Sequence, residues 1–337
     1  MSLHELRPTC VLIGDIGGTN ASLELLVERD GVLCGVHELL LPSGAYASFE
    51  LLLEQFFAQT GIRADSVSAA CFSVAGPVEA GVCSMTNLSW RIDAAALSAR
   101  FRIPEVHLLN DFAAVGYGIA SLGEHDVLSL QRAVQQPQGT RLVVGAGTGL
   151  GVCMLNWQGQ AYAVHASEAG HADFAPLDAT QDALLAALRE PFGRVSYERI
   201  VSGPGLLRIF GFLQDHRGAV PSIPLRLAMQ KQDEAAAISE FAISKLDPLA
   251  VAALDLFVSV YGAFAGNLAL ATLARGGVYI AGGIARKIAA KLNDGGFMRA
   301  FVDKGRFADL LRRYPVHIVT DPKVGLKGAL NYLQLQG

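Results

Sequence analysis

Charge is scarce in this chain of 337 residues, and it does not gather into patches. Charged residues make up 17% of the sequence, the formal net charge is −4, and no run of like charge stands out. Nucleic acids and anionic membranes attract proteins through clustered Lys and Arg side chains. The sequence therefore gives no electrostatic support for either partner.

Cysteine is also sparse, and its spacing argues against cysteine-based sites. The five cysteines are scattered and form no Cys-x-x-Cys pair. An odd, unpatterned set is typical of buried thiols in a reducing compartment, not of a disulfide framework or a zinc site. The opening stretch "MSLHELRPTC" lacks the apolar segment of a secretory signal, and we expect a cytoplasmic protein.

Apolar residues and glycine, in contrast, are plentiful. Residues of the apolar classes make up 51% of the chain, and 36 residues are glycine. This profile is typical of an α/β enzyme with buried strands and tight turns. The length predicts about two domains.

One apolar segment, 251–274, is long enough to cross a bilayer. Gly262 and Gly266 form a GxxxG pattern within it, as in packed membrane helices. Asp255 and Asn267 interrupt it, however, and the sequence has no second span of this kind. We predict a buried helix whose small residues let another element approach closely.

Two stretches resemble each other across about 130 residues. Each of 11–27 ("VLIGDIGGTNASLELLV") and 141–155 ("RLVVGAGTGLGVCML") has an apolar strand, a glycine turn with a threonine, and a second apolar run. In the second run apolar and small residues alternate, and they show no helical spacing. Both stretches are therefore predicted to be β-hairpins. A repeat at this distance indicates two related domains.

The remaining pattern alternates between strands and helices. A polar segment lies around 165–204, and helices plus a loop are expected over 210–247. The spacing predicts helices at 46–61, 112–123, 284–292 and 325–334, and strands at 66–76, 106–111, 277–284 and 316–321.

The first glycine turn fits neither of the common phosphate-binding motifs. A Walker A loop needs a lysine that is absent here, and a dinucleotide fingerprint runs into a helix, whereas "GDIGGT" runs into a strand. The remaining functional interpretation is a hairpin turn whose backbone N–H groups and Thr19 hydroxyl bind phosphate oxygens. The structural alternative is a hairpin turn without a ligand, with glycines at positive φ and Asp15 bonded to local N–H groups.

Asp15 is decisive for the functional interpretation, because a carboxylate repels phosphate at contact distance. A divalent cation between the two removes the conflict: Asp15 would hold Mg²⁺ through water, and Mg²⁺ would bind phosphate oxygens. The second turn, "GAGTG" at 145–149, offers the same backbone without the acid. "AGGI" at 281–284 adds a strand–helix junction where backbone can lie flat against a nucleoside.

Six segments follow one another over about 11–330: "GDIGGTN", "LLNDF", "GAGTGLG", "SEAGHADFAP", "ERIVSGPG" and "GGVYIAGGI". In their order and rough spacing the chain resembles the bacterial glucokinases, outside the repressor/kinase group, in the hexokinase–actin-like ATPase superfamily. The resemblance implies two actin-like (ribonuclease H-like) α/β domains with an interdomain cleft. It also implies ATP with Mg²⁺, phosphorylation of glucose at its 6-hydroxyl, and a homodimer. The expected domains are 1–121 plus 316–337, and 122–315.

The same resemblance implies the roles of individual residues. Asp111 matches the family's general base, and Asn110, Glu168, His171 and Glu198 match residues that bind sugar hydroxyls. The expected nucleotide-binding residues are those of the three glycine segments: Gly14, Asp15, Gly17, Gly18, Thr19 and Asn20 in the first, Gly147, Thr148 and Gly149 in the second, and Gly282 and Gly283 in the third.

The residues alone leave other interpretations open. Asp111, between a strand and a helix, also fits a helix N-cap. Glu168 and His171 also fit a solvated loop, or a two-histidine, one-carboxylate metal set with His165, although the spacing matches no common metal motif.

Three positions depart from the family pattern. Ser22 stands where the family usually has arginine, which removes a cation near the phosphates. Ser167 and Ala169 replace two glycines of the sugar segment. These departures leave a kinase for another hexose, or a weakly catalytic or non-catalytic sugar sensor, as alternatives to a glucokinase.

Overall fold

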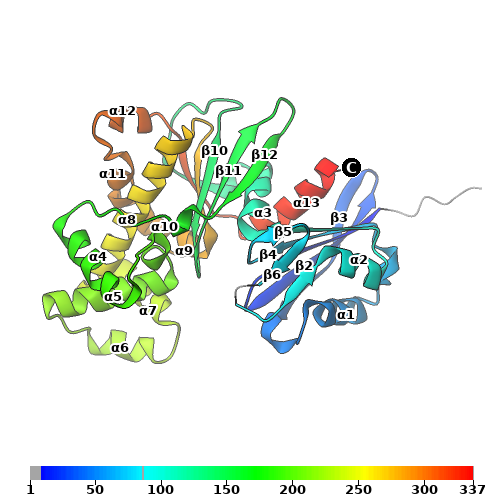
Figure 1. The fold of residues 1–337 in the computed structure, drawn as a ribbon, viewed down its shortest axis with the longest axis horizontal. Coiled ribbons are helices and arrows are strands. Elements are labelled where there is room, and N and C mark those ends of the chain that lie inside the picture. Colours follow the sequence, from blue (N-terminus) through cyan, green and yellow to red (C-terminus); the bar gives the residue numbers. More distant parts are fainter. Residues whose placement is uncertain (1–8, 86, 337) are drawn as a thin grey trace, which may run out of the picture. The chain divides into compact units, whose positions relative to one another are not determined.

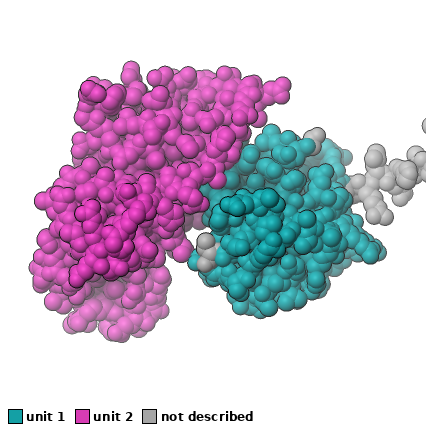
Figure 2. All heavy atoms as spheres, in the orientation of Figure 1, with its two compact units in different colours: residues 1–122, 322–337 teal, residues 123–321 magenta. Residues whose placement is uncertain are grey.

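The computed structural model describes residues 9–85 and 87–336, and the chain divides into two compact units (Figures 1 and 2). Unit 1 comprises residues 1–122 and 322–337, and unit 2 comprises residues 123–321. Each unit is built on its own β-sheet with its own hydrophobic core.

Unit 1 contains a five-stranded sheet in the order β3-β2-β1-β4-β8. β1 pairs antiparallel with β2 and parallel with β4, so the glycine turn at 17–19 is the hairpin predicted from the sequence. The small sheet β5-β6-β7 lies within the same unit. The strands of the main sheet are β1 (Cys10–Ile16), β2 (Asn20–Arg29), β3 (Val32–Pro42), β4 (Ala69–Val74) and β8 (Glu105–Asn110), and those of the small sheet are β5 (Val78–Glu79), β6 (Val82–Ser84) and β7 (Arg91–Asp93).

Helices cover both faces of the unit 1 sheet. α1 (Phe49–Thr60) and α2 (Ala94–Phe101) bury their apolar sides on one face. α3 (Asp111–Gly118) and α13 (Val324–Gln336) pack on the other, where they share a core with Val11 and Ile13 of β1. Alternate strand residues face opposite sides, so Asp15, two residues beyond Ile13, projects on the α13 face.

Unit 2 repeats this plan. Its sheet has the order β12-β11-β10-β13-β14-β9; the hairpin β10–β11 extends antiparallel to β12, and β10, β13 and β14 run parallel. The second predicted hairpin is therefore confirmed. The strands are β9 (Val127–Gln131), β10 (Arg141–Ala146), β11 (Leu150–Trp157), β12 (Tyr162–Ser167), β13 (Val278–Ala281) and β14 (Val316–Val319).

The strand at 316–319 differs from the expected domain assignment. It was expected in the first domain, but β14 pairs with β13 and with β9 inside unit 2. Val316 and Ile318 are fully buried in the core of unit 2, which accounts for the position of the strand. Of the C-terminal elements, α13 alone belongs to unit 1 among the described residues.

α8 (Pro248–Thr272) is the long apolar helix of unit 2. Among the described residues it alone is long and apolar enough to cross a membrane, yet 72% of its most apolar window is buried within the fold, as predicted for a core helix. A Cβ on Gly262 would lie 2.2 Å from the carbonyl oxygen of Phe297, and a Cβ on Gly266 would lie 2.3 Å from that of Phe301. The GxxxG pattern therefore lets α11 (Gly296–Val302) pack directly on the α8 backbone.

Other helices surround α8. Residues 179–192 form α4 within the stretch that the sequence analysis described only as a polar segment, and the burial of Leu184, Leu185 and Leu188 explains the helix. The 210–247 stretch holds helices and loops, as expected. The remaining α-helices of the unit are α5 (Gly203–Arg217), α6 (Ile223–Met229), α7 (Glu234–Ile243), α9 (Gly282–Lys287), α10 (Ala289–Leu292) and α12 (Ala308–Leu311).

Candidate functional site

The first glycine turn is held in a fixed shape by its own backbone and by Ser43. The Gly17 N–H donates to the carbonyl of Asn20 (2.9 Å). Ser43, which is fully buried, donates its hydroxyl to the Gly17 carbonyl (2.7 Å) and its N–H to the Thr19 carbonyl (2.9 Å). The two Ser43 bonds occupy carbonyl oxygens and the Gly17 N–H is engaged with Asn20, so it is the other N–H groups of this turn that a phosphate could meet.

Glycine is needed at Gly14 and Gly18 because other side chains lie too close for a Cβ atom there. A Cβ on Gly14 would lie 2.7 Å from Leu23, and a Cβ on Gly18 would lie 2.9 Å from Asn87. The described residues with positive φ include neither glycine, nor Gly17. The alternative that the turn needs glycine for positive φ is therefore wrong.

Asp15 is the exposed residue of the otherwise buried strand β1. Ser73, opposite it on β4, donates its hydroxyl to the Asp15 carboxylate (3.1 Å). Asp15 is also paired with Ser22 of β2, on the other side of β1, so Ser22 and Asp15 face the same side of the sheet. A Cβ on Gly325 would lie 3.7 Å from the carboxylate, so the first turn of α13 packs against Asp15, where the helix dipole favours a negative charge.

Asn110, not Asp111, is the N-cap of α3. Its side-chain oxygen accepts the N–H groups of Phe112 (3.0 Å) and Ala113 (3.2 Å), and its amide donates to the Gly76 carbonyl (3.1 Å). Asp111 is the first residue of the helix, half-buried, and it accepts the Phe112 N–H (2.9 Å). The N-cap interpretation of Asp111 is therefore wrong, and the capping function belongs to its neighbour.

Cys83 lies near Asp111 but is no candidate nucleophile. Burial, and secondarily the Asp111 carboxylate, raise the pKa of the Cys83 thiol, so it stays protonated at neutral pH. Four of the five cysteines are buried and Cys34 is half-buried; all five are free thiols, as their spacing predicted.

The second glycine turn, in unit 2, joins β10 to β11. The Gly147 N–H donates to the Gly149 carbonyl (2.8 Å), and the Gly203 N–H at the start of α5 donates to the Gly147 carbonyl (2.9 Å). Thr148 at the tip is exposed. The turn is thus tied to the N-terminus of a fifteen-residue helix.

Three predicted sugar-binding residues come together beside this second turn. His171 Nδ1 lies 3.8 Å from Glu198 Oε1, and His171 Nε2 lies 3.8 Å from Glu168 Oε2. The other oxygen of Glu198 accepts the N–H of Leu150 (3.0 Å), the residue that follows the turn. Unit 2 therefore places a carboxylate–imidazole–carboxylate group next to a glycine turn.

The third glycine segment also approaches the second turn. Gly282 has φ of 89°, and a Cβ there would lie 2.6 Å from the Ala146 carbonyl oxygen, whereas a Cβ on Gly283 would meet nothing within 4 Å. Ala146 is also held by α8: its N–H donates to the hydroxyl of the fully buried Tyr261, which donates to the Val144 carbonyl. The strand before the turn is therefore fixed by α8.

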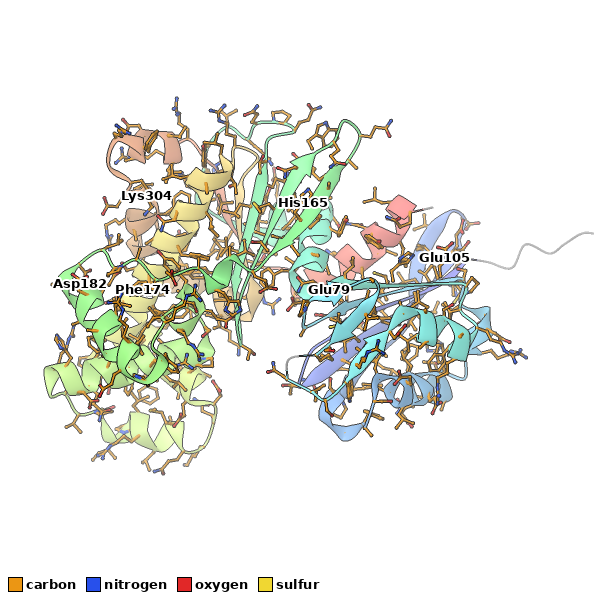
Figure 3. The ribbon with its side chains drawn as sticks, viewed as in Figure 1. Glu79, Glu105, His165, Phe174, Asp182 and Lys304 are labelled. Atoms are coloured by element: carbon orange, nitrogen blue, oxygen red, sulfur yellow. The ribbon has the colours of Figure 1, made fainter. Side chains whose placement is uncertain are left out.

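His165 lies in the strand β12 (Figure 3). Across the described ranges, no group of three His, Cys, Asp or Glu side chains could hold a metal ion, and this includes His165 with Glu168 and His171. The metal set weighed for these residues is therefore not formed.

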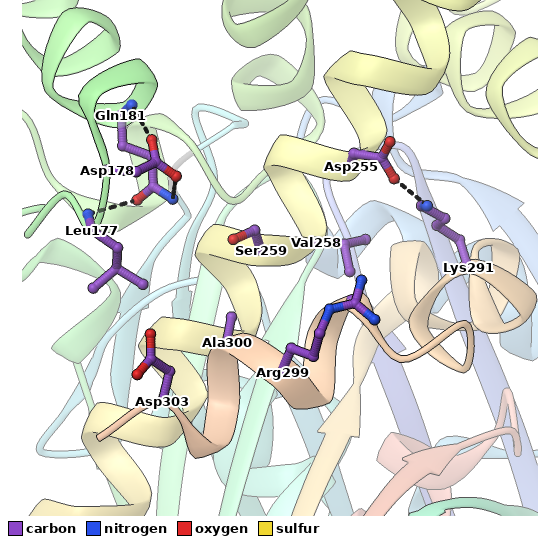
Figure 4. Close-up of a pocket in the computed structure, with 11 residues that line it drawn as sticks. Leu177, Asp178, Gln181, Asp255, Val258, Ser259, Lys291, Arg299, Ala300 and Asp303 are labelled. Atoms are coloured by element: carbon purple, nitrogen blue, oxygen red, sulfur yellow. Dashed lines mark hydrogen bonds and ion pairs between the residues drawn. The ribbon is translucent and has the colours of Figure 1, made fainter. Parts of the chain in front are cut away.

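Unit 2 also has a cavity of about 460 Å³ between α4, α8 and α11 (Figure 4). Lys291 at its margin is paired with Asp255 and Asp294, and Arg299 also lines it. None of the residues predicted for the site lines this cavity.

Three supporting residues, Ser43, Ser73 and Tyr261, were not predicted from the sequence. Ser73 had a detectable signal, because it lies in a predicted strand beside the one that carries Asp15. Ser43 and Tyr261 had none, because each acts on backbone that is distant in the sequence.

The model of the Glucokinase family matches residues 12–336. The chain belongs to the glucokinase family. Glucokinases of Nostoc sp. and Synechocystis sp. are 41% and 42% identical to it, over 95% and 94% of this chain and 98% and 96% of their own. The crystal structure of a glucokinase from an Antarctic psychrotroph has a TM-score of 0.81 and 29% identity, covering 97% of this chain and 99% of that one. These similarities confirm the predicted family and the two-domain sugar-kinase fold.

Proposed function

We propose that this member of the glucokinase family transfers the γ-phosphoryl group of ATP to the 6-hydroxyl of glucose, giving glucose 6-phosphate, ADP and a proton. The observation that carries the proposal is the group of Glu168, His171 and Glu198 beside the second glycine turn. A site for hydroxyl groups next to backbone suited to phosphate fits transfer between a sugar and a nucleotide. The names of the curated relatives support glucose as the sugar.

Asp111 would act as the general base. Its carboxylate would accept the proton of the 6-hydroxyl as the oxygen attacks phosphorus, and the bond from phosphorus to the ADP oxygen breaks. Phosphoryl transfer depends mostly on positioning and electrostatics, so a carboxylate suffices as the base. The cap formed by Asn110 supports this role, because it fixes the backbone from which Asp111 projects.

Four residues would hold the sugar: Asn110, Glu168, His171 and Glu198. Glu168 and Glu198 can each accept bonds from two hydroxyl groups, and His171 can donate or accept. Asn110 uses one amide N–H on Gly76, which leaves its second N–H for a sugar hydroxyl.

The two glycine turns would bind the phosphates, with Thr19 and Thr148 adding hydroxyl donors, and Gly282 and Gly283 would lie against the nucleoside. Asp15 fits a Mg²⁺ site: its carboxylate is exposed beside a turn whose N–H groups suit phosphate, and Mg²⁺ usually binds one or two carboxylates together with substrate phosphates. Bound there, Mg²⁺ would neutralise charge on the phosphate oxygens. We also propose a cytoplasmic homodimer, which rests on the family resemblance.

The proposal predicts ADP release that depends on both sugar and Mg²⁺. In a panel of hexoses with ATP, we expect turnover with glucose, and loss of that turnover when Mg²⁺ is chelated with EDTA and its return when Mg²⁺ is restored. Faster turnover with mannose, fructose or an amino sugar would instead identify a kinase for that hexose. No turnover with any sugar would favour a non-catalytic sugar sensor.

Ser22 provides a second test. An arginine there would lie opposite Asp15 on the same face of the sheet, near the first turn. We expect Ser22→Arg to lower the KM for ATP several-fold, because a cation near the turn attracts phosphate. Ser22→Gln, which adds a longer polar side chain without charge, is the control. An unchanged KM in Ser22→Arg would remove any role for the missing cation.

A further inference from the structure

Glu198 has two different neighbours, one at each carboxylate oxygen. Oε1 lies 3.8 Å from His171 Nδ1, on the proposed sugar side. Oε2 accepts the N–H of Leu150, directly after the second glycine turn. One side chain therefore contacts both the sugar group and the backbone of the proposed phosphate turn.

Glu198 is itself held by the segment that binds the other end of the turn. Its carbonyl accepts the Ser202 hydroxyl (2.7 Å), and Ser202 caps α5. The next residue, Gly203, donates its N–H to the Gly147 carbonyl. The segment 198–203 thus contacts the turn at its first residue and immediately beyond its last one.

The Glu198 carboxylate lies close against the second glycine turn. A Cβ on Gly149 would lie 2.6 Å from Oε2 of Glu198. The second sugar segment contacts the same place, because a Cβ on Gly170 would lie 2.0 Å from the Leu150 carbonyl oxygen. The peptide groups of Leu150 are therefore enclosed by Glu198 on one side and by the segment carrying Glu168 and His171 on the other.

We propose that Glu198 is a positioning residue for the second glycine turn, through which sugar binding and nucleotide binding favour each other. A carboxylate can accept bonds from a sugar hydroxyl and from Leu150 at the same time. The Glu198 side chain is 31% exposed, so it keeps some conformational freedom. A bound sugar that fixes this side chain also fixes the Leu150 N–H bond. The nucleotide then binds a turn that is already ordered, and it no longer has to supply the free energy for that ordering. Coupling of this kind must be reciprocal.

This inference rests on the proposed function, and the test separates the two. Dissociation constants for glucose and for a non-hydrolysable ATP analogue are measured alone and with the other ligand saturating. We expect glucose to tighten binding of the analogue about tenfold, within the usual range of coupling between sites, and the analogue to tighten glucose equally.

Gly149→Ala is the decisive variant. The added methyl group displaces the carboxylate from the Leu150 N–H, so the coupling factor is expected to fall to about 1. Gly147→Ala is the matched comparison in the same turn: its Cβ would meet nothing within 4 Å, so the coupling factor should persist even if affinity for the analogue changes. Circular dichroism and thermal melting establish that each variant is folded.

A double-mutant cycle covers the case in which Gly149→Ala fails to fold. Glu198→Ala removes the acceptor and should abolish coupling, and adding Gly149→Ala to it should then change the coupling factor no further. Full coupling in Gly149→Ala or in Glu198→Ala, or equal loss in Gly147→Ala, would overturn the proposal. Turnover of glucose with independent binding in the wild type would overturn the coupling alone, whereas absence of glucose binding would overturn the proposed function as well.

Discussion

The Asp111→Ala variant is expected to lose glucose phosphorylation by about 10²–10⁴-fold in kcat, the usual contribution of a general base. Glucose should still bind, because Glu168, His171 and Glu198 lie in the other unit and are unchanged. The helix should also remain intact, since its N-cap is Asn110. Steady-state kinetics and calorimetric glucose titration measure the two quantities separately.

Asn110→Ala is the matched control for this prediction. It keeps the carboxylate but removes the cap, so it should lower the stability of unit 1 by about 1 kcal/mol, as for other lost caps. Asp111→Ala should leave stability nearly unchanged. Undiminished turnover in Asp111→Ala would overturn the proposed base, and an unfolded Asp111→Ala protein would overturn the assignment of the cap.

Gly328→Ala is expected to destabilise unit 1 by about 3 kcal/mol, at the upper end of the usual cost of overpacking. A Cβ on Gly328 of α13 would lie 1.7 Å from the Ala114 carbonyl oxygen of α3, and one on Gly118 would lie 2.1 Å from the Val324 carbonyl oxygen. The two helices therefore touch backbone to backbone, and backbone cannot move aside as a side chain can. Because α3 begins at Asp111 and α13 begins beside Asp15, their separation should also reduce turnover.

Gly211→Ala in α5 is the control for a glycine-to-alanine change inside a helix. Its Cβ would meet nothing within 4 Å, so the higher helix propensity of alanine should stabilise unit 2 by about 0.5–1 kcal/mol. Amide hydrogen exchange, followed in peptides from each unit, resolves the two effects. Unchanged protection of unit 1 in Gly328→Ala would contradict the close packing of α3 on α13.

Much of the sheet architecture was predictable because it depends on local patterns. The two glycine hairpins and the buried helix at 251–274 followed from periodicity and from turn residues, which act over a few residues. The acid in the first turn was equally noticeable, because an aspartate within a glycine-rich turn is anomalous for phosphate binding whatever surrounds it.

Contacts between distant segments were not predictable in this way. Asn110 and Asp111 are adjacent and both suit a cap, and only the backbone geometry decides between them. The apolar pattern of 316–319 predicts a buried strand, but it does not indicate which of the two sheets the strand joins. The contact of Ser43 with the first turn has no signal in sequence spacing.

The position of α13 has a consequence for biosynthesis. The helix is formed by residues 324–336, yet it covers the sheet face that Val11 and Ile13 help to form. A ribosome releases the chain from its N-terminus, so unit 2, which ends at residue 321, can close its core before unit 1 can. Strand β1 therefore waits for α13, and the carboxylate of Asp15 gains its helical neighbour only after the whole of unit 2 has been synthesised.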